Sequence, residues 1–174
     1  MRYPTGRLSI STTLGTISYS KKIPCQGPPG LRKFSRQEWF EKSLKQLNQA
    51  NIIFLDPDNG LEVMSKPYGR KCSSKYVYWR EVEALWLSGK SLLIYQHFIH
   101  ENRFNFIQRI LEALRSATPD SFVEAFSTPH VVFLMALQPK HQRFHSAIIS
   151  SVQGSWEGQI QHWELTLTQQ GAPS

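Results

Sequence analysis

The chain has 174 residues, of which 40% are hydrophobic and 19% charged, and this composition predicts one folded domain rather than a disordered chain. Its apolar runs are too short for a membrane span, and its two cysteines, Cys25 and Cys72, are too few for a disulfide-rich secreted scaffold. The net charge is +7, and residues 1–80 hold 14 Lys and Arg against 5 Asp and Glu, which favours contact with a polyanion such as nucleic acid.

The first part of the chain has weak patterns and leads into a helix. Residues 1–34 are rich in Ser, Thr, Gly and Pro and are expected to be irregular, with one or two short strands within 8–19. Ser35 is a good N-cap and Glu38 follows three residues later, so this capping box predicts a helix that begins there.

Two continuous apolar runs predict the buried strands of a parallel sheet. The first run is 51–56, ended by the turn sequence Asp-Pro-Asp-Asn-Gly at 56–60, and the second is 91–98. The other expected elements are helices at 77–88, 101–117 and 141–152, and strands at 122–127, 130–137 and 159–168. This order predicts an α/β layered sheet, mainly parallel with antiparallel C-terminal strands, in a single domain over 35–170 with a tail at 171–174.

The ends of these two strands present polar side chains that form a candidate site. Ligands of open α/β sheets bind beyond the carboxyl ends of the strands. Asp56, Asp58 and Asn59 follow the first strand and His97 follows the second, so we expect the four side chains to converge if the strands are neighbours. However, Asp-Pro and Asn-Gly are also ordinary turn dipeptides, and a lone histidine at a strand end is usually structural. The sequence is therefore compatible with two interpretations, a catalytic site and a simple turn.

The following segment combines cations with aromatic rings. Residues 66–80 contain no acidic side chain, and tyrosines and a tryptophan lie between the basic ones. The basic residues are Lys66, Arg70, Lys71, Lys75 and Arg80. Cations that meet phosphates and rings that stack on bases are typical of a nucleic-acid interface. The alternative is that the rings belong to the core and the cations only keep the surface soluble.

Metal-binding motifs are weak in this sequence. His97 and His100 have no cysteine or further histidine at zinc-ligand spacing, so no metal centre is predicted. Asp56, Asp58 and Glu62 resemble, loosely, the carboxylates of a metal-dependent nuclease, and we keep that function as an alternative.

Several motifs together resemble those of a known protein family. They are Arg36 with Trp39 and Phe40, the segment 52–63, Ser74 to Val77 with Glu81, and the segment 89–98. They resemble a family of uncharacterised bacterial proteins that is distantly similar to the 23S ribosomal RNA adenine-N6 methyltransferases. In those enzymes a strand ends in Asp-Pro-Pro-Tyr, and this loop holds the target amine beside S-adenosylmethionine. Here the turn at 56–60 occupies that place, with Asp58 and Asn59 instead of the second proline and the tyrosine.

The resemblance implies a Rossmann-like fold and a methyltransferase-like protein that acts on or binds nucleic acid, with S-adenosylmethionine as cofactor. The two cysteines, taken as reduced thiols, separately favour a cytoplasmic location. Asp56 would anchor the loop, Asp58 and Asn59 would orient the substrate amine, and His97 would line the crevice. The family's N-terminal cofactor-binding segment has no counterpart here, so the chain is expected to be an N-terminally truncated member with an incomplete sheet and impaired activity. The alternatives are the metal-dependent nuclease, a non-catalytic nucleic-acid-binding module, and a fragment without stable function.

Overall fold

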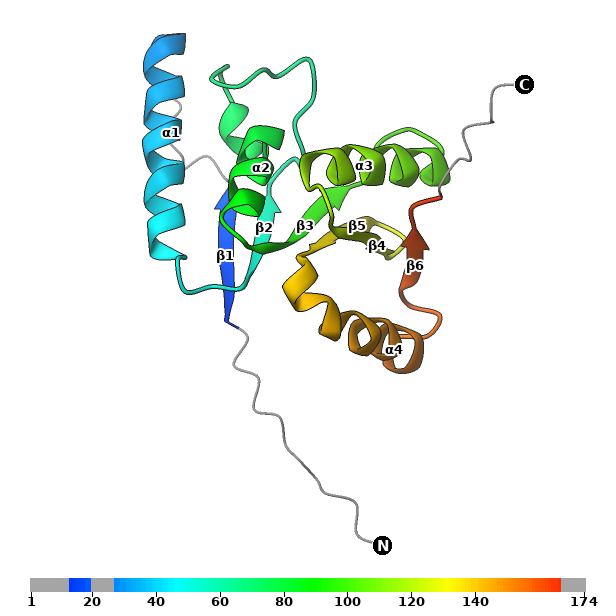
Figure 1. Ribbon diagram of the computed structural model, residues 1–174. Coiled ribbons are helices and arrows are strands. Elements are labelled where there is room, and N and C mark those ends of the chain that lie inside the picture. Colours follow the sequence, from blue (N-terminus) through cyan, green and yellow to red (C-terminus); the bar gives the residue numbers. More distant parts are fainter. Residues whose placement is uncertain (1–12, 20–26, 167–174) are drawn as a thin grey trace, which may run out of the picture.

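The computed structural model describes residues 13–19 and 27–166, and Figure 1 shows their helices and strands. The strands are β1 (Leu14–Tyr19), β2 (Ile52–Pro57), β3 (Ser91–His97), β4 (Phe122–Ser127), β5 (Val131–Leu137) and β6 (Gln161–Glu164). The helices are α1 (Pro29–Gln46), α2 (Trp79–Leu87), α3 (Arg103–Ala117) and α4 (His145–Ser155), with short 3₁₀ helices at Ser73–Lys75 and Pro139–Phe144.

The strands form one mixed sheet in the order β1-β2-β3-β5-β4-β6. β1, β2 and β3 are parallel neighbours, as the two apolar runs predicted for β2 and β3. β5 pairs antiparallel with both β3 and β4, and β6 pairs antiparallel with β4. The antiparallel C-terminal strands are therefore confirmed, but the parallel pairing is limited to the first three strands and is not the main type.

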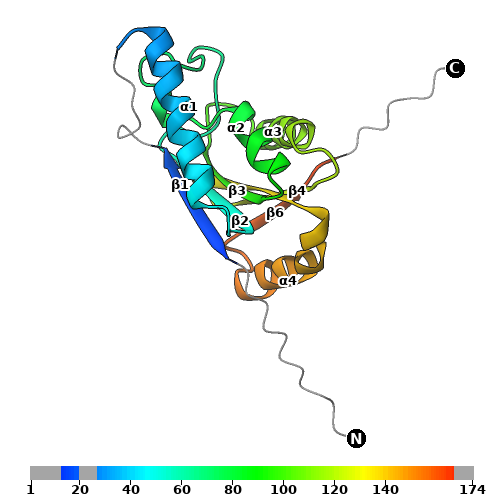
Figure 2. The same ribbon diagram turned by 60° about the vertical axis from the view of Figure 1, so that its left-hand side comes forward.

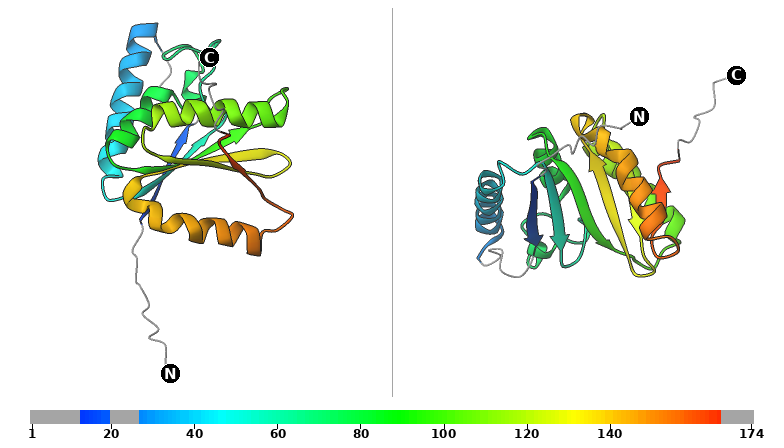
Figure 3. Two further views of the ribbon diagram at one scale, coloured as in Figure 1. Left: turned by 45° about the vertical axis from the view of Figure 1, so that its right-hand side comes forward. Right: turned by 90° about the horizontal axis from the view of Figure 1, so that it is seen from below.

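The helices cover the two faces of the sheet unequally. α1, α2 and α3 lie together on one face, here called the helix face, and α4 lies alone on the other, here called the open face (Figures 2 and 3). A doubly wound sheet needs helices on both faces of its parallel strands. The α/β class is thus confirmed, whereas a Rossmann-like arrangement is not.

The main core lies between the sheet and the helix face. Ile53 and Leu55 of β2 and Ile94 of β3 are fully buried, because alternate residues of a strand point to the same side. α3 packs against β4 and β5 and adds Ile107 and Leu111 to this core; these two residues are four positions apart and therefore share one side of the helix. Each such side chain stabilises the fold by about 1.5–3 kcal/mol through burial alone.

α4 packs more loosely against the open face. None of its residues is buried. An apolar cavity of about 400 Å³ separates it from the sheet. Ile148 and Val152 line this cavity from α4, and Leu93, Phe133 and Met135 line it from the strands.

The start of the domain differs from the prediction. Residues 14–19 form β1, a full strand of the sheet, and α1 begins at Pro29, so the domain starts before the expected boundary at residue 35. Pro28 is the N-cap and Pro29 the first helical residue, where a missing amide hydrogen costs nothing and the fixed φ favours a helix. The predicted capping box was wrong, because Ser35 and Glu38 lie inside α1.

The remaining elements are confirmed with small shifts at their ends. The helix expected at 141–152 is divided into a 3₁₀ helix and α4, and β6 ends at Glu164 rather than at residue 168. The stretch 8–12 and the expected tail at 171–174 lie outside the described residues. Within the described ranges, no helix has both the length and the apolar character needed to cross a membrane.

Candidate functional site

The turn after β2 is fixed by the segments on either side of it. The Asp58 amide donates to the carbonyl of Tyr19 in β1 (3.0 Å), and the Asn59 amide donates to the Lys75 carbonyl (3.0 Å). The Asp58 carboxylate also lies 3.4 Å from the Lys75 ammonium in a partly exposed ion pair. The turn is therefore a defined platform at the carboxyl ends of the parallel strands.

Gly60 and Gln96 join this turn to β3. Gly60 has a φ of +87°, which favours glycine, and a Cβ there would lie 2.3 Å from Gln96 Oε1. The buried Gln96 carboxamide accepts a hydrogen bond from the Leu61 amide (2.7 Å) and donates one to the His97 carbonyl (2.8 Å). One side chain thus links the ends of two neighbouring strands.

The four predicted catalytic residues lie at the carboxyl ends of β2 and β3, but they do not share a pocket. Asp56 and His97 are exposed, and strand alternation places both on the open face. The His97 ring packs edge-on against Tyr95, with ring centroids 4.9 Å apart. Asp58 and Asn59 are exposed on the turn. None of the four lines the pocket at the end of β4, the pocket beside α2 or the apolar cavity under α4.

The carboxylates of the nuclease alternative do not come together. In the part of the chain that the structure describes, the one group of three side chains with metal-binding atoms within 4.8 Å of one another lies elsewhere, in β4 and β6. Glu62 instead accepts a hydrogen bond from the Trp79 amide (3.3 Å) at the start of α2.

A buried ion pair behind the turn joins α1 to α2. Arg36 Nε donates to Glu81 Oε1 (2.7 Å), and Arg36 Nη2 donates to Glu81 Oε2 (2.9 Å). The guanidinium also donates to the carbonyls of Ser73 (2.7 Å) and Tyr76 (2.6 Å). Glu81 in turn accepts from the Tyr78 amide (3.2 Å). These contacts fix the loop before α2 and the first turn of that helix.

Three tyrosine rings surround the Arg36 guanidinium, with centroids 4.6 Å (Tyr78), 5.3 Å (Tyr68) and 5.6 Å (Tyr19) from it. Burial opposes the charged guanidinium, but the hydrogen bond and charge of Glu81 outweigh it and raise the pKa of Arg36. Burial raises the pKa of Tyr19 well above its usual range and that of Tyr78 to about 12. The hydroxyls of Tyr19 and Tyr68 are buried and have no hydrogen-bond partner among the described residues.

A pocket of about 520 Å³, here called the loop pocket, opens beside this cluster. Its walls are mostly aromatic or apolar, with one carboxylate and one guanidinium. They consist of Glu62, Val63, Met64, Pro67, Tyr68, Tyr78, Trp79 and Arg80. The Arg80 guanidinium lies 4.6 Å from the centroid of the Tyr68 ring. The Tyr68 ring also meets the Tyr78 ring edge-on, with centroids 5.1 Å apart. The loop pocket therefore offers flat rings and both signs of charge to a ligand.

Glu62 has an unusual environment at the wall of the loop pocket. Burial raises the pKa of its carboxyl, and the charges of Glu81 and Glu83 act in the same direction. The hydrogen bond from the Trp79 amide opposes this shift without cancelling it. Glu62 is therefore easier to protonate than an ordinary surface glutamate.

The predicted basic residues fall into two groups. Lys66, Arg70 and Lys71 are exposed, and none forms an ion pair with another described residue. Lys75 is half-buried and pairs with Asp58, whereas Arg80 lies over Tyr68. Three cations of the loop are thus free to meet an anion.

The first turn of α1 adds basic side chains to the same surface. Arg32 Nε donates to the Gly69 carbonyl (2.8 Å). A Cβ on Gly69, which has a φ of +82°, would lie 2.3 Å from Lys33 Cγ, so the loop and α1 are in close contact.

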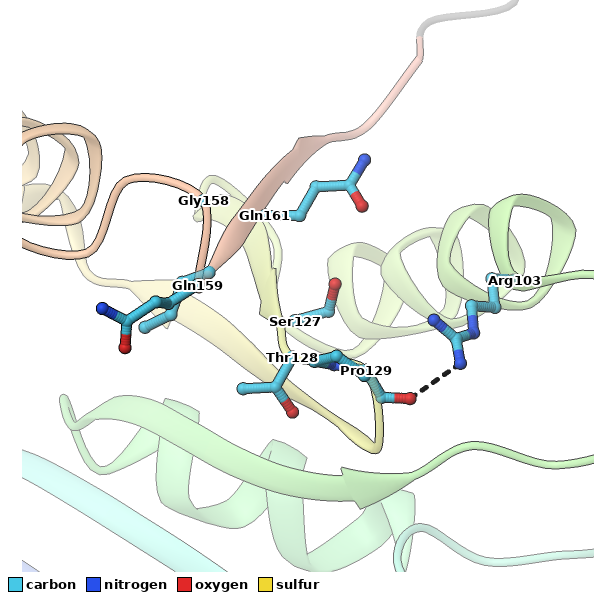
Figure 4. A pocket seen from close by; sticks show the side chains of 8 residues that line it. Arg103, Ser127, Thr128, Pro129, Gly158, Gln159 and Gln161 are labelled. Carbon is cyan, nitrogen blue, oxygen red and sulfur yellow. Dashed lines mark hydrogen bonds between the residues drawn. The ribbon is translucent and has the colours of Figure 1, made fainter.

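A second pocket, of about 360 Å³, lies at the end of β4. Figure 4 shows Arg103, the first residue of α3, donating to the Pro129 carbonyl (2.7 Å) beside Ser127 and Thr128. Gln159 and its neighbours close the other side. This pocket has no aromatic wall, so it offers a ligand fewer kinds of contact than the loop pocket.

Sequence reasoning missed the contacts that organise this region. Arg36 and Glu81 were both noted as motif residues, but nothing in the sequence predicted that they touch. One available signal is the spacing of Arg36 and Phe40, the two buried residues of α1, which places an arginine on the apolar side of that helix. No sequence pattern indicated that the Gln96 side chain would hydrogen-bond to the Leu61 amide.

Comparisons of the chain with protein-family models, with curated proteins and with solved structures gave no match. Function is therefore inferred from the geometry of the described residues.

Proposed function

We propose that the protein binds single-stranded nucleic acid, with one base in the loop pocket and the neighbouring phosphates on the cations of the loop. The main support is the position of Arg80 over Tyr68 at the wall of a pocket of about 520 Å³. Aromatic rings and arginine planes stack on the flat face of any base. Glu62 can accept a hydrogen bond from an exocyclic amine, or donate one when it is protonated.

The exposed cations supply the second part of the interface. Lys66, Arg70 and Lys71 are not occupied by carboxylates of the described chain, so they can replace the counterions of a phosphate backbone. Arg32 and Lys33 extend this basic surface along α1. Such binding depends strongly on salt and only weakly on sequence.

Binding of a labelled single-stranded RNA of about 12 nucleotides, followed by fluorescence anisotropy at several salt concentrations, tests the phosphate contacts. The triple variant Lys66→Ala, Arg70→Ala, Lys71→Ala should bind more weakly, and its log–log salt slope should fall by about 2, since each phosphate contact to a single strand contributes about 0.7. The control triple variant Lys42→Ala, Lys45→Ala, Arg115→Ala removes the same charge from exposed positions elsewhere. Equal losses in the two variants would contradict a localised interface.

A pair of variants at Tyr68 tests the base pocket. Tyr68→Ala removes the ring and should cost about 1–3 kcal/mol of binding free energy, the usual value of one stacked base. Tyr68→Phe keeps the ring and should bind within about twofold of the parent chain, because stacking does not need the hydroxyl. If both variants bind like the parent chain, the base does not enter the loop pocket.

Methyl transfer to a nucleic-acid amine is the second candidate function. It is favoured by the fixed turn after β2, which presents Asp58 and Asn59 at the carboxyl end of a parallel strand between two parallel neighbours. In this proposal Asp56 anchors the turn, Asp58 and Asn59 orient the amine, and His97 lines the same edge. Methyl transfer to an amine needs positioning more than acid–base chemistry, so a fixed turn suits it. S-adenosylmethionine as cofactor, a Rossmann-like fold and a cytoplasmic location remain part of this proposal.

A thermal melt with and without millimolar S-adenosylhomocysteine tests the second function, because a ligand of the native state must raise Tm. Adenosine, which lacks the amino-acid part, is the matched control. Where methyl transfer to RNA is detected, Asp56→Ala should abolish it and leave the fold intact, since Asp56 is exposed. An unchanged Tm, or activity retained in this variant, would leave nucleic-acid binding as the function.

A further inference from the structure

Two carboxylates and two imidazoles meet on the open face, away from the loop pocket. Glu124 of β4 lies directly opposite Glu164 of β6 in the sheet register, and His162 is two residues before Glu164 on the same face. The ligand atoms of these three residues all lie within 4.8 Å of one another. His145, the first residue of α4, approaches from the other side and makes a hydrogen bond between its Nε2 and Glu124 Oε1.

One oxygen of the Glu124 carboxylate and one ring nitrogen of His162 are buried without a hydrogen-bond partner among the described residues. Glu124 is only 6% exposed. Its Oε2 lies 3.2 Å from His162 Nε2, yet neither atom has a partner with hydrogen-bond geometry among the described residues. A buried carboxylate oxygen without a partner is unfavourable, and two like charges opposite each other on neighbouring strands are unfavourable as well. A cation between these atoms would remove both costs.

The surroundings hold the potential ligands in position. The His162 ring stacks on Phe126, with centroids 5.3 Å apart and planes 17° apart. Gln108 of α3 donates to the Glu164 carbonyl (2.9 Å) and accepts from the Thr166 amide (2.7 Å). Its carboxamide therefore forms, with the end of β6, the two backbone hydrogen bonds that a neighbouring strand would otherwise make.

The residue between the two ligands of β6 is fixed from the helix face. Trp163 Nε1 donates to Ser127 Oγ (2.8 Å). Because neighbouring strand residues point to opposite faces, this contact fixes the side on which His162 and Glu164 project.

We propose that Glu124, His162 and Glu164 bind a divalent transition-metal ion, with Zn²⁺ the best match, and that His145 orients the Glu124 carboxylate. Neutral imidazoles and carboxylates are the nitrogen and oxygen ligands that zinc takes in tetrahedral sites, whereas calcium and magnesium prefer oxygen alone. The three ligands come from β4 and β6, and His145 at the start of α4 contacts one of them, Glu124, by a hydrogen bond. An ion that fixes the Glu124 carboxylate therefore also supports the contact of α4 with the open face, where the helix has no buried residue of its own.

Sequence spacing gave no hint of this centre. Glu124 and His162 are 38 positions apart, and the sheet register alone brings them together.

The test uses the full chain with both cysteines replaced by serine, freed of metal with EDTA. Titration calorimetry with zinc chloride should show one ion per chain, and Tm should rise with zinc by mass action. Glu164→Gln should raise the Kd for zinc by about tenfold or more, since even partners behind metal ligands change affinity by such factors. Glu164 is exposed, so this variant is expected to fold.

Two further variants complete the test. His162→Gln should abolish the zinc-dependent rise in Tm, whereas the double control His100→Ala, His130→Ala should keep it, because both control residues are exposed and lie outside the cluster. Cobalt(II) bound to the parent chain should show the visible absorption bands of a tetrahedral site. The proposal is overturned if zinc does not bind the parent chain in a one-to-one ratio, or if Glu164→Gln and His162→Gln bind it as tightly as the control does. In that case the four side chains form only a histidine–carboxylate cluster.

Discussion

Ser91 Oγ and His141 Nδ1 lie 2.7 Å apart at the buried start of β3, although the two residues are 50 positions apart in the chain. The Ser91 hydroxyl already accepts a hydrogen bond from the Gln138 amide (2.9 Å), so its proton is available for Nδ1. When the hydroxyl donates this proton, Nδ1 is the acceptor and carries no hydrogen of its own. Burial lowers the pKa of His141, and the nearby charges of Lys140 and Arg143 lower it further.

The first prediction concerns the pH dependence of stability. A histidine with a lowered native pKa binds fewer protons in the native state than in the unfolded state, so the free energy of unfolding falls as pH falls through 6.5 towards the lowered pKa. Urea unfolding between about pH 7.5 and pH 5 should show this loss. His141→Gln should reduce the slope, and His130→Gln, at an exposed position, should leave it unchanged. Equal slopes in all three proteins would show that His141 does not titrate as described.

The second prediction concerns the buried pair of Arg36 and Glu81. Arg36→Met should lower the free energy of unfolding by about 3–5 kcal/mol, because it leaves a buried carboxylate without its partner. In a Glu81→Gln background the same change should cost much less stability, since no buried carboxylate is then left without a partner. Arg109→Met, which breaks the exposed pair with Glu101, is the matched control and should cost less than about 1 kcal/mol. Chemical denaturation of the parent chain, the two single variants at Arg36 and Glu81 and the double variant gives the coupling energy directly.

The third prediction concerns Gly60. Gly60→Ala places a side chain at positive φ and a Cβ against the Gln96 carboxamide, so it should cost about 1–3 kcal/mol of stability. Gly154→Ala is the matched control, because Gly154 is in α4 and a Cβ there would meet nothing within 4 Å. That variant should gain up to about 1 kcal/mol through its higher helix propensity. Equal effects at the two positions would mean that the turn is not constrained by Gln96.

The fourth prediction concerns Glu62. A carboxyl whose native pKa is raised destabilises the native state above that pKa, and the cost disappears below the unfolded value of about 4.5. Glu62→Gln should therefore raise Tm at neutral pH and lose this advantage at about pH 4. Glu83→Gln, at an exposed position of the neighbouring helix α2, should show a smaller effect. Differential scanning calorimetry at the two pH values checks both variants.

The part of the fold that could be predicted from sequence is the part determined by local patterns. Residues 52–55 and 92–95 are consecutive apolar residues, a pattern typical of strands in a parallel sheet, and the sequence of α3 repeats apolar residues at helical spacing. The start of α1 was mispredicted because two good signals competed. Pro28 and Pro29 begin the helix, so the later capping box at Ser35 was not used.

The candidate site was less predictable because its contacts join distant segments. The turn at 56–60 and the basic loop could be located from composition, but Arg36 and Glu81 are 45 positions apart and Leu61 and Gln96 are 35 apart. The faces of the sheet also mattered. Asp56 points to the open face, while the loop pocket forms beside α2, so the expected convergence did not follow from strand order alone.

The loose packing of α4 predicts where the folded molecule opens locally. A helix with no buried residue, which covers an apolar cavity instead of filling it, loses little when it lifts from the sheet. Its amide hydrogens should therefore exchange with deuterium long before those of α3, whose apolar side is buried in the core. The slowest-exchanging amides should lie in β2, β3 and α3, and the open face should become accessible while that half of the molecule stays folded.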